Sequence, residues 1–222
     1  MNSHTETDFE PRFGFKRPPD TCWVRFLDPR FQPSGVPGGW MALPFETLIH
    51  MDLPRKLLIS ENRVPILSLP AYQDTLAIWG GGGAATLLAR ESWVTDRKIH
   101  YWGDLDCHGL FIYGNFKAIA PGTKKFLMDE DTLLKFSTLV GSYKDRLPPA
   151  PKSLDHGETA LFNRLASEQL RLEQERIPHK YVLAKLEQHG FEHICQDSHL
   201  GLEKGKISKN SVSTTLDETG LN

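Results

Sequence analysis

Two aspartates separated by one residue close a short apolar run in KIHYWGDLDCHGLFI, residues 98–112. The run predicts a buried strand, and the residues after Gly109 predict an amphipathic helix. If the strand stays extended, Asp104 and Asp106 point to one face with carboxylates roughly 6–7 Å apart. Their repulsion would cost about 2–3 kcal/mol at an effective dielectric of about 20. A divalent cation would relieve it, and oxygen ligands favour Mg²⁺ or Mn²⁺ over zinc. An exposed turn rich in aspartate remains the alternative.

A third carboxylate follows another predicted strand. Glu61 comes directly after the apolar run LLIS and begins ENRVPIL. Parallel strands end at one edge of a sheet, so Glu61 is expected to face the aspartate pair. Its alternative role is to cap a helix that Pro65 begins. Taken together, three carboxylates at two strand ends favour a metal site that serves phosphoryl transfer.

A glycine-rich turn, WGGGGAA, lies at residues 79–85 between a predicted strand and a predicted helix. It lacks the lysine and hydroxyl residues of a P-loop, and it is no dinucleotide fingerprint. Gly81 and Gly82 would allow backbone N–H groups to approach a phosphate at the helix N-terminus. A tight turn without a ligand is the alternative.

The charged stretch RLEQER, residues 171–176, permits two conformations. In a helix, Arg171 and Glu175 would form an ordinary i,i+4 ion pair. In an extended segment before Pro178, Glu173 and Glu175 would share a face and could complete a second metal position. The periodicity does not choose between them.

The elements that must position these residues alternate between strand and helix, which favours an open, mainly parallel α/β sheet flanked by helices. Strands are expected within 22–31 and at 55–60, 75–80, 98–104 and 124–128, and helices at 84–94, 109–120 and 129–140, with two more in ETALFNRLASEQL and HKYVLAKLEQHG. The expected organisation is a flexible arm over residues 1–20, one domain with a C-terminal helical extension over 21–195, and a disordered tail over 196–222.

The bulk composition is ordinary for a globular protein, with 26 Lys and Arg against 28 Asp and Glu. A net charge of −2 neither requires nor excludes nucleic acid, because a basic groove can be offset by acidic surface elsewhere. The sequence contains no apolar run of membrane-spanning length and no secretory pattern. Three dispersed cysteines suggest neither a disulfide framework nor a zinc ribbon. These features predict a reduced, cytoplasmic protein.

The ordered pieces VRFLDP, ISENRVPILSLP, AIWGGGGAATLL, IHYWGDLDCHGLFI, FLMDEDTLL and LRLEQERIP resemble a known family. The general resemblance is to the Toprim domain of topoisomerases and primase-type enzymes. The nearer one is to the C-terminal domain of JetD, the Wadjet anti-plasmid defence nuclease family related to the topoisomerase VI A subunit. The similar pieces cover about residues 22–185.

This resemblance implies divalent-metal-dependent cleavage of the DNA backbone. It assigns Mg²⁺ or Mn²⁺ to Glu61, Asp104 and Asp106, and makes Glu173 and Glu175 candidates for further ligands. Asp129 and Glu130 are an alternative to that second pair, although helix capping explains them equally well. The candidate phosphate contacts are Arg63, Lys124 and Lys125. The implied partners are circular plasmid DNA, SMC-type defence subunits and a second copy of the chain, with no membrane.

The chain departs from the family pattern in beginning almost at the Toprim-bearing half. The winged-helix tyrosine of a topoisomerase VI-type transesterase is therefore not expected, and hydrolysis by water is the consistent chemistry. Capture of DNA would then need another subunit. Two other functions stay open: a non-catalytic module that docks onto DNA or an SMC-type complex, and a nucleotide-binding protein, which the missing P-loop lysine disfavours.

Overall fold

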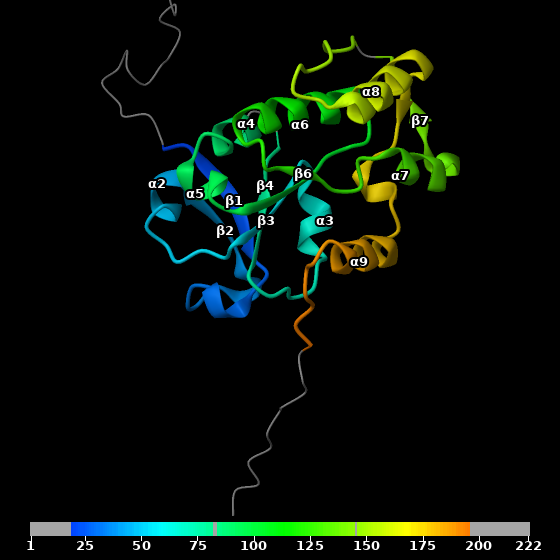
Figure 1. Cartoon of the computed structure of the whole chain (residues 1–222). Helices are drawn as coiled ribbons and strands as arrows, with labels where there is room; N and C mark the ends of the chain where they lie inside the picture. The colour runs from blue at the N-terminus through cyan, green and yellow to red at the C-terminus, as the bar shows by residue number, and fades with distance from the viewer. Residues whose placement is uncertain (1–18, 82–83, 145, 196–222) are drawn as a thin grey trace, which may run out of the picture.

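Six strands form one mostly parallel sheet at the centre of the molecule (Figure 1), for which a computed structural model describes residues 19–81, 84–144 and 146–195. The strands are β1 (Thr21–Phe26), β2 (Trp40–Pro44), β3 (Lys56–Ser60), β4 (Thr75–Trp79), β5 (Lys98–Trp102) and β6 (Lys124–Lys125), in the order β2-β1-β4-β3-β5-β6. Strand β3 pairs in parallel with β4 and β5, and β5 pairs in parallel with β6. Strand β1 is antiparallel to both of its neighbours. The predicted α/β class is confirmed.

Helices cover both faces of this sheet (Figure 1). On one face, Tyr101 of β5 packs against Tyr113 and Phe116 of α6, with ring centroids 6.0 and 5.8 Å apart. On the other face, Trp102 borders a cavity of about 220 Å³ together with residues of α3 and α9. The helices of four or more residues are α2 (Phe45–Leu48), α3 (Arg63–Leu67), α4 (Ala84–Leu88), α5 (Ser92–Thr95), α6 (Cys107–Ile119), α7 (Glu130–Lys135), α8 (His156–Glu168) and α9 (His179–Gln188).

Three predicted elements differ in extent from the structure. The helix expected at 84–94 is divided into α4 and α5, and Leu87 of α4 is 39% exposed. The helix expected at 129–140 ends at Lys135 and is followed by the 3₁₀ turn η3 (Ser137–Leu139). Strand β6 has two residues instead of five, because Leu127 turns the chain away with a φ of 56°. Helices α8 and α9 match the two last predicted helices.

Two strand pairings were not expected. Strand β2 follows the Pro/Gly-rich loop and forms the sheet edge beyond β1, although its sequence WMALP shows no alternation of polar and apolar residues. A small second sheet joins β7 (Gly141–Ser142) to β8 (Leu170–Arg171). This second pairing matters for the site, because it holds the start of the RLEQER stretch beside the main sheet.

Residues 1–18 and 196–222 lie outside the described residues, and they include nearly all of the predicted arm and the whole of the predicted tail. Within the described ranges, no helix is both long and apolar enough to cross a membrane. Cys22 and Cys107 are buried and Cys195 is exposed, and all three are free thiols, as expected.

Gly109, in the first turn of α6, allows the turn after β5 to pack against the helix start. A Cβ there would collide with the carbonyl oxygen of Asp104. We expect Gly109→Ala to lower the free energy of unfolding by roughly 2–3 kcal/mol and Tm by about 5–10 °C. Gly122→Ala is the matched control, because a Cβ at Gly122 meets no atom within 4 Å. Thermal unfolding followed by circular dichroism compares the two, and equal Tm values would contradict this role of Gly109.

Candidate active site

The parallel register of β3 and β5 brings three carboxylates to one edge of the sheet. Ser60 pairs with Trp102, and the backbone N–H of Glu61 donates to the carbonyl of Trp102 at 2.9 Å. Glu61 and Asp104 therefore leave the sheet side by side, and Oε2 of Glu61 lies 3.4 Å from the backbone nitrogen of Asp104. The structure thus places Glu61 next to the aspartate pair, as the two strand ends predicted.

Arg171 supplies the positive charge that the aspartate pair requires. Its Nη2 donates to Oδ2 of Asp104 at 2.7 Å, and its Nε lies 3.4 Å from Oδ2 of Asp106. Both aspartates are buried, whereas the arginine side chain is 38% exposed. The two carboxylates face a common cation, and in this structure that cation is a guanidinium.

Backbone and amide donors fix the orientation of each aspartate. Oδ1 of Asp104 accepts from the backbone N–H of Gln174 at 3.0 Å and from Nδ2 of Asn62 at 3.1 Å. Oδ1 of Asp106 accepts from the backbone N–H of Gly109 at 2.7 Å, so Asp106 is the N-cap of α6. Three donors thus hold Asp104, which keeps it in one rotamer.

Gln174 joins the RLEQER stretch to the strand ends. This buried side chain accepts from the backbone N–H of Asn62 at 3.0 Å and donates from Nε2 to Oγ of Ser60 at 3.1 Å. Asn62 and Gln174 were not singled out from the sequence. The position of Asn62 next to Glu61 was the available signal for it, whereas the role of Gln174 depends on a contact between distant segments.

The RLEQER stretch is neither one helix nor one extended segment. Arg171 ends β8, Leu172 forms a two-way backbone bridge with Leu105, and the 3₁₀ turn η4 covers Gln174–Arg176. The i,i+4 pair of Arg171 with Glu175 is not among the ion pairs of the described residues. The long-range pairing with the aspartates takes its place.

The two glutamates of this stretch lie at the rim of the site. Glu173 forms an ion pair with Arg176 at 2.9 Å and lies 3.9 Å from Nε of Arg171. Glu175 is exposed and accepts from Nδ2 of Asn62 at 3.1 Å, and the same amide group donates to Asp104. Each glutamate therefore lies next to a residue, Arg171 or Asn62, that itself contacts Asp104.

Negative charge in this cluster exceeds what one arginine neutralises. Burial raises the pKa of Glu61 to about 7, with further contributions from the charges of Asp104 and Asp106. Burial also raises the pKa of Asp106, against the opposing effects of the Gly109 N–H and of Arg171. The site therefore favours additional positive charge.

The donor set has the chemistry of a site for a hard divalent cation, since it consists of carboxylate oxygens. Within the described residues, no three Asp, Glu, His or Cys side chains already surround one point as metal ligands would. In this structure Arg171 and two other donors occupy the oxygens of Asp104. The buried Nε of Arg171 has no hydrogen-bond partner in the described part of the chain. Its contact with Asp106 is thus imperfect, and a metal would replace the arginine rather than add to it.

The glycine turn is explained by packing at the two positions described. A Cβ at Gly80 would lie 2.9 Å from Cγ2 of Ile59, and a Cβ at Gly81 would collide with the indole of Trp79. Gly82 lies outside the described residues. Arg63, exposed at the start of α3, lies over the Trp79 ring at 5.4 Å. The tight-turn alternative accounts for Gly80 and Gly81 without a phosphate.

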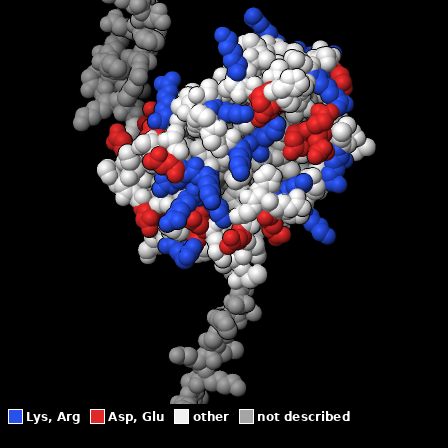
Figure 2. Space-filling model, viewed as in Figure 1, with Lys and Arg blue, Asp and Glu red and all other residues white. Residues whose placement is uncertain are grey.

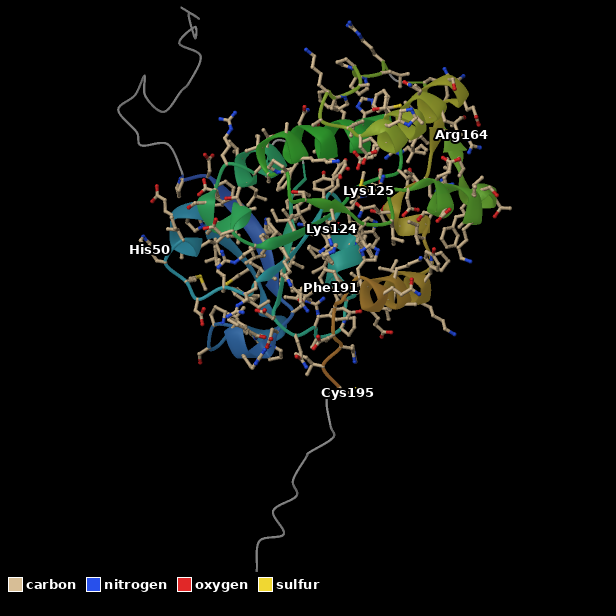
Figure 3. All side chains as sticks on the ribbon, in the orientation of Figure 1. His50, Lys124, Lys125, Arg164, Phe191 and Cys195 are labelled. Atoms are coloured by element: carbon tan, nitrogen blue, oxygen red, sulfur yellow. The ribbon has the colours of Figure 1, made fainter. Side chains whose placement is uncertain are left out.

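The neighbouring lysines of β6 point to opposite faces of the sheet. Lys125 pairs with Tyr101 in the β5–β6 register and lies 3.6 Å from Oε1 of the buried Glu158 in α8. Lys124 pairs with His100 and is exposed on the face of α9 (Figure 3). Only Lys124 keeps an uncommitted charge, because Lys125 neutralises a buried acid.

The alternative acidic pair has structural roles. Asp129 caps α7 by accepting from the backbone N–H of Thr132 at 2.8 Å, and Glu130 forms an ion pair with Arg164. These contacts agree with the helix-capping interpretation.

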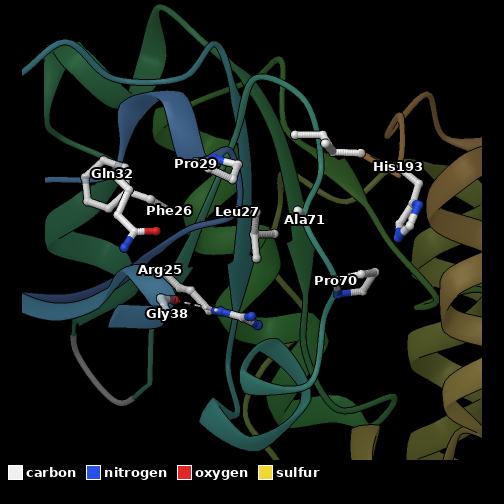
Figure 4. Close-up of a pocket in the computed structure, with 10 residues that line it drawn as sticks. Arg25, Phe26, Leu27, Pro29, Gln32, Gly38, Pro70, Ala71 and His193 are labelled. Atoms are coloured by element: carbon white, nitrogen blue, oxygen red, sulfur yellow. Dashed lines mark hydrogen bonds between the residues drawn. The ribbon is translucent and has the colours of Figure 1, made fainter. Parts of the chain in front are cut away.

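A second cavity lies away from the carboxylates. It has a volume of about 490 Å³ and opens where β1 ends, beside the loop before β4 (Figure 4). Arg25 lines it, but Nη1 of this residue already donates to the carbonyls of Ile66 at 2.6 Å and Leu67 at 2.9 Å. Because β1 is antiparallel to β4, the end of β1 lies beside the start of β4. This cavity is therefore at the opposite end of the parallel strands from Glu61.

Fold and site together define an α/β protein with a buried acidic cluster at the carboxyl edge of parallel strands. The family model described as Wadjet protein JetD, C-terminal, matches residues 14–186, and the chain belongs to this family. This confirms the resemblance to JetD. A comparison with curated proteins gave no match.

Removal of Arg171 tests whether this arginine holds the cluster. We expect Arg171→Ala to lower the free energy of unfolding by about 1–3 kcal/mol without metal, less than a fully buried pair because the side chain is partly exposed. Mg²⁺ should stabilise the variant more than the wild type, since it would bind without displacing the guanidinium.

The control is Arg164→Ala, which removes exposed ion pairs with Glu130 and Glu168. Because these pairs are exposed to solvent, it should change the free energy of unfolding little and leave the response to Mg²⁺ unchanged. Thermal unfolding in EDTA and in Mg²⁺ gives both quantities. If the two variants behaved alike in both solutions, Arg171 would not be the counter-charge of the cluster.

Proposed function

We propose that this chain is the metal-dependent DNA endonuclease component of a Wadjet plasmid-defence system, with a Toprim-type site. One observation carries the proposal: Glu61, Asp104 and Asp106 meet at the carboxyl edge of β3 and β5, in a member of the JetD family. Membership of that family supports a role in Wadjet defence within a multi-subunit complex. The acidic edge supports phosphoryl-transfer chemistry.

In this proposal, Glu61, Asp104 and Asp106 hold Mg²⁺ or Mn²⁺, and Glu173 and Glu175 at the rim complete the set. A bound divalent ion would supply charge stabilisation at the scissile phosphate and a water of lowered pKa. The protein fixes the positions of the carboxylate ligands. Asn62 and Gln174 keep Asp104 oriented by donating to its Oδ1, and the Gly109 N–H fixes Asp106.

Arg171 has a separate part in the proposed site. It neutralises Asp104 and Asp106 when no metal is bound, which keeps two buried carboxylates from repelling each other. Once released, its guanidinium becomes a donor for phosphate oxygens at the same edge, a contact that arginine makes with good geometry. Water is the nucleophile in this scheme, and the proposed reaction is phosphodiester hydrolysis.

The proposed partners follow from the same family membership. DNA, as a circular plasmid, is the substrate, and SMC-type subunits of the defence complex deliver it. A homodimer would bring two such sites together in one complex, one for each strand of the DNA.

A non-catalytic role has one observation in its favour. Asp104 accepts from Arg171, Gln174 and Asn62, so its hydrogen bonds are satisfied by the protein alone. In this second function, the ion-paired edge is a structural joint, and the fold docks onto DNA or onto an SMC-type complex.

Plasmid cleavage separates the two functions. We expect the chain, with its complex partners where these are needed, to relax or linearise supercoiled plasmid in Mg²⁺ or Mn²⁺. Asp104→Asn/Asp106→Asn should lower the rate at least 100-fold because the ligand charge is lost, and the asparagines retain the shape of the folded site. Asp52→Asn/Asp96→Asn is the matched control, since both residues are exposed and neither is at this edge.

Agarose gels give the rates, and circular dichroism verifies that each variant is folded. Cleavage by the folded Asp104→Asn/Asp106→Asn variant at the wild-type rate would refute the assignment of the site. A wild type that is inert with its partners and with Mn²⁺ would favour the docking function.

A further inference from the structure

Three lysines on neighbouring strands share one face of the sheet. Lys56 of β3 is in register with Lys98 of β5, and His100 of β5 is in register with Lys124 of β6. Residues two apart on a strand point to the same side, so Lys98 and His100 face alike. The register therefore places Lys56, Lys98, Lys124 and His100 on the face that carries α9.

These lysines lack acidic partners among the residues that the structure describes. None of the three has a carboxylate within 4 Å in that part of the chain, whereas Lys117 and Lys125 are both paired with Glu158. Lys98 and Lys124 are exposed, and Lys56 donates to the carbonyl of Gly190 at 2.7 Å. Like charges on adjacent strands repel each other. The fold thus keeps a row of cations, the β3–β5–β6 lysine row, without internal neutralisation.

Two histidines beside this row experience its positive potential. The rings of His100 and His189 lie 5.6 Å apart. The pKa of His100 is lowered to about 4, mainly by burial and then by the positive charges of His189, Lys124 and Lys56 in that order. Burial followed by Lys185 also lowers the pKa of His189; Asp129 raises it, and Lys124 lowers it.

His100 also has an unmet hydrogen-bonding group. Its side chain is 7% exposed, and Nδ1 has no hydrogen-bond partner in the described part of the molecule. A buried polar group without a partner is costly. This nitrogen lies beneath the lysine row, and its missing partner adds a cost to keeping the row on this face.

We propose that the β3–β5–β6 lysine row is a second DNA contact surface, which binds the phosphate backbone on the α9 face. Figure 2 shows blue side chains gathered across the middle of the view, with the red ones mainly toward its rim, and Figure 3 places Lys124 near that middle. Lysines are flexible point charges that suit phosphate contacts made without regard to sequence. Neighbouring strands are about 4.8 Å apart, so the row extends roughly 10 Å across three strands.

This surface is distinct from the carboxylate edge. Lys56 begins β3 and Glu61 follows its last residue, so they lie about 16 Å apart at the rise of an extended strand. DNA held here would be anchored without approaching the acidic cluster, whose charge repels phosphate when no metal is bound. The choice of DNA as the polyanion rests on the proposed function, but the contact itself needs neither metal nor cleavage.

The test is DNA binding in EDTA by fluorescence anisotropy with a 30-base-pair duplex, from 50 to 200 mM salt. The variant is Lys56→Gln/Lys98→Gln/Lys124→Gln. Each phosphate contact contributes about 0.9 to the slope of log K against log salt, so losing three should reduce the slope by about 2.7. The wild type should then lose about 40-fold more affinity than the variant over this salt range.

The matched control is Arg90→Gln/Arg146→Gln/Lys152→Gln, which removes the same charge from exposed positions elsewhere. Equal slopes for the two triple variants, or no DNA binding by the wild type, would overturn the proposal. A protein that cleaves no plasmid but shows the expected change in slope would retain this surface and lose only the nuclease assignment.

Discussion

Two buried carboxylates held side by side need a positive charge, and the C-terminal half of the fold is arranged around this requirement. Arg171 reaches Asp104 and Asp106 from a segment 67 residues further along the chain than Asp104. The backbone bridge between Leu105 and Leu172 holds that segment in place. The bridge and the ion pairs act on adjacent residues, so they hold the segment between α8 and α9 against the strand end together.

The parallel sheet determines how strong this requirement is. Its register brings Glu61 to the same edge as the aspartate pair, and burial removes most of the water that would screen the three charges. Hydrogen bonds from Asn62, Gln174 and the Gly109 backbone orient the aspartates but add no charge. One guanidinium therefore serves a cluster of three carboxylates, and the pKa of Glu61 is raised by burial first and then by the charges of the two aspartates.

Local sequence patterns predicted five of the six strands of the main sheet and the acidic residues at the strand ends. The short apolar runs before Glu61 and Asp104 predicted β3 and β5, and the shared edge of parallel strands predicted that their acids meet. Contacts between distant segments could not be read in this way. Arg171 pairs with the two aspartates and not with Glu175 in a helical i,i+4 pair. This long-range pairing could not be predicted, because no local periodicity indicates such a partner. The division of Lys124 and Lys125 between two faces follows from a register that only the folded sheet defines. Strand β2 was missed because an edge strand, paired on one side only, needs no regular alternation.

The near-zero net charge of the chain conceals a separation of charge within one sheet. Strand β3 begins at a lysine and is followed at its other end by Glu61, and β5 begins at a lysine and is followed by the aspartate pair. The acidic end is buried and only partly neutralised by Arg171, whereas the basic row on the α9 face has no acidic partner within 4 Å among the described residues. An acidic edge that repels a phosphate backbone can act on it only if another surface supplies the attraction. A sheet whose parallel strands run from lysine to carboxylate holds both kinds of charge within about 16 Å, and the hydrolysis of a polyanion that we propose would use both.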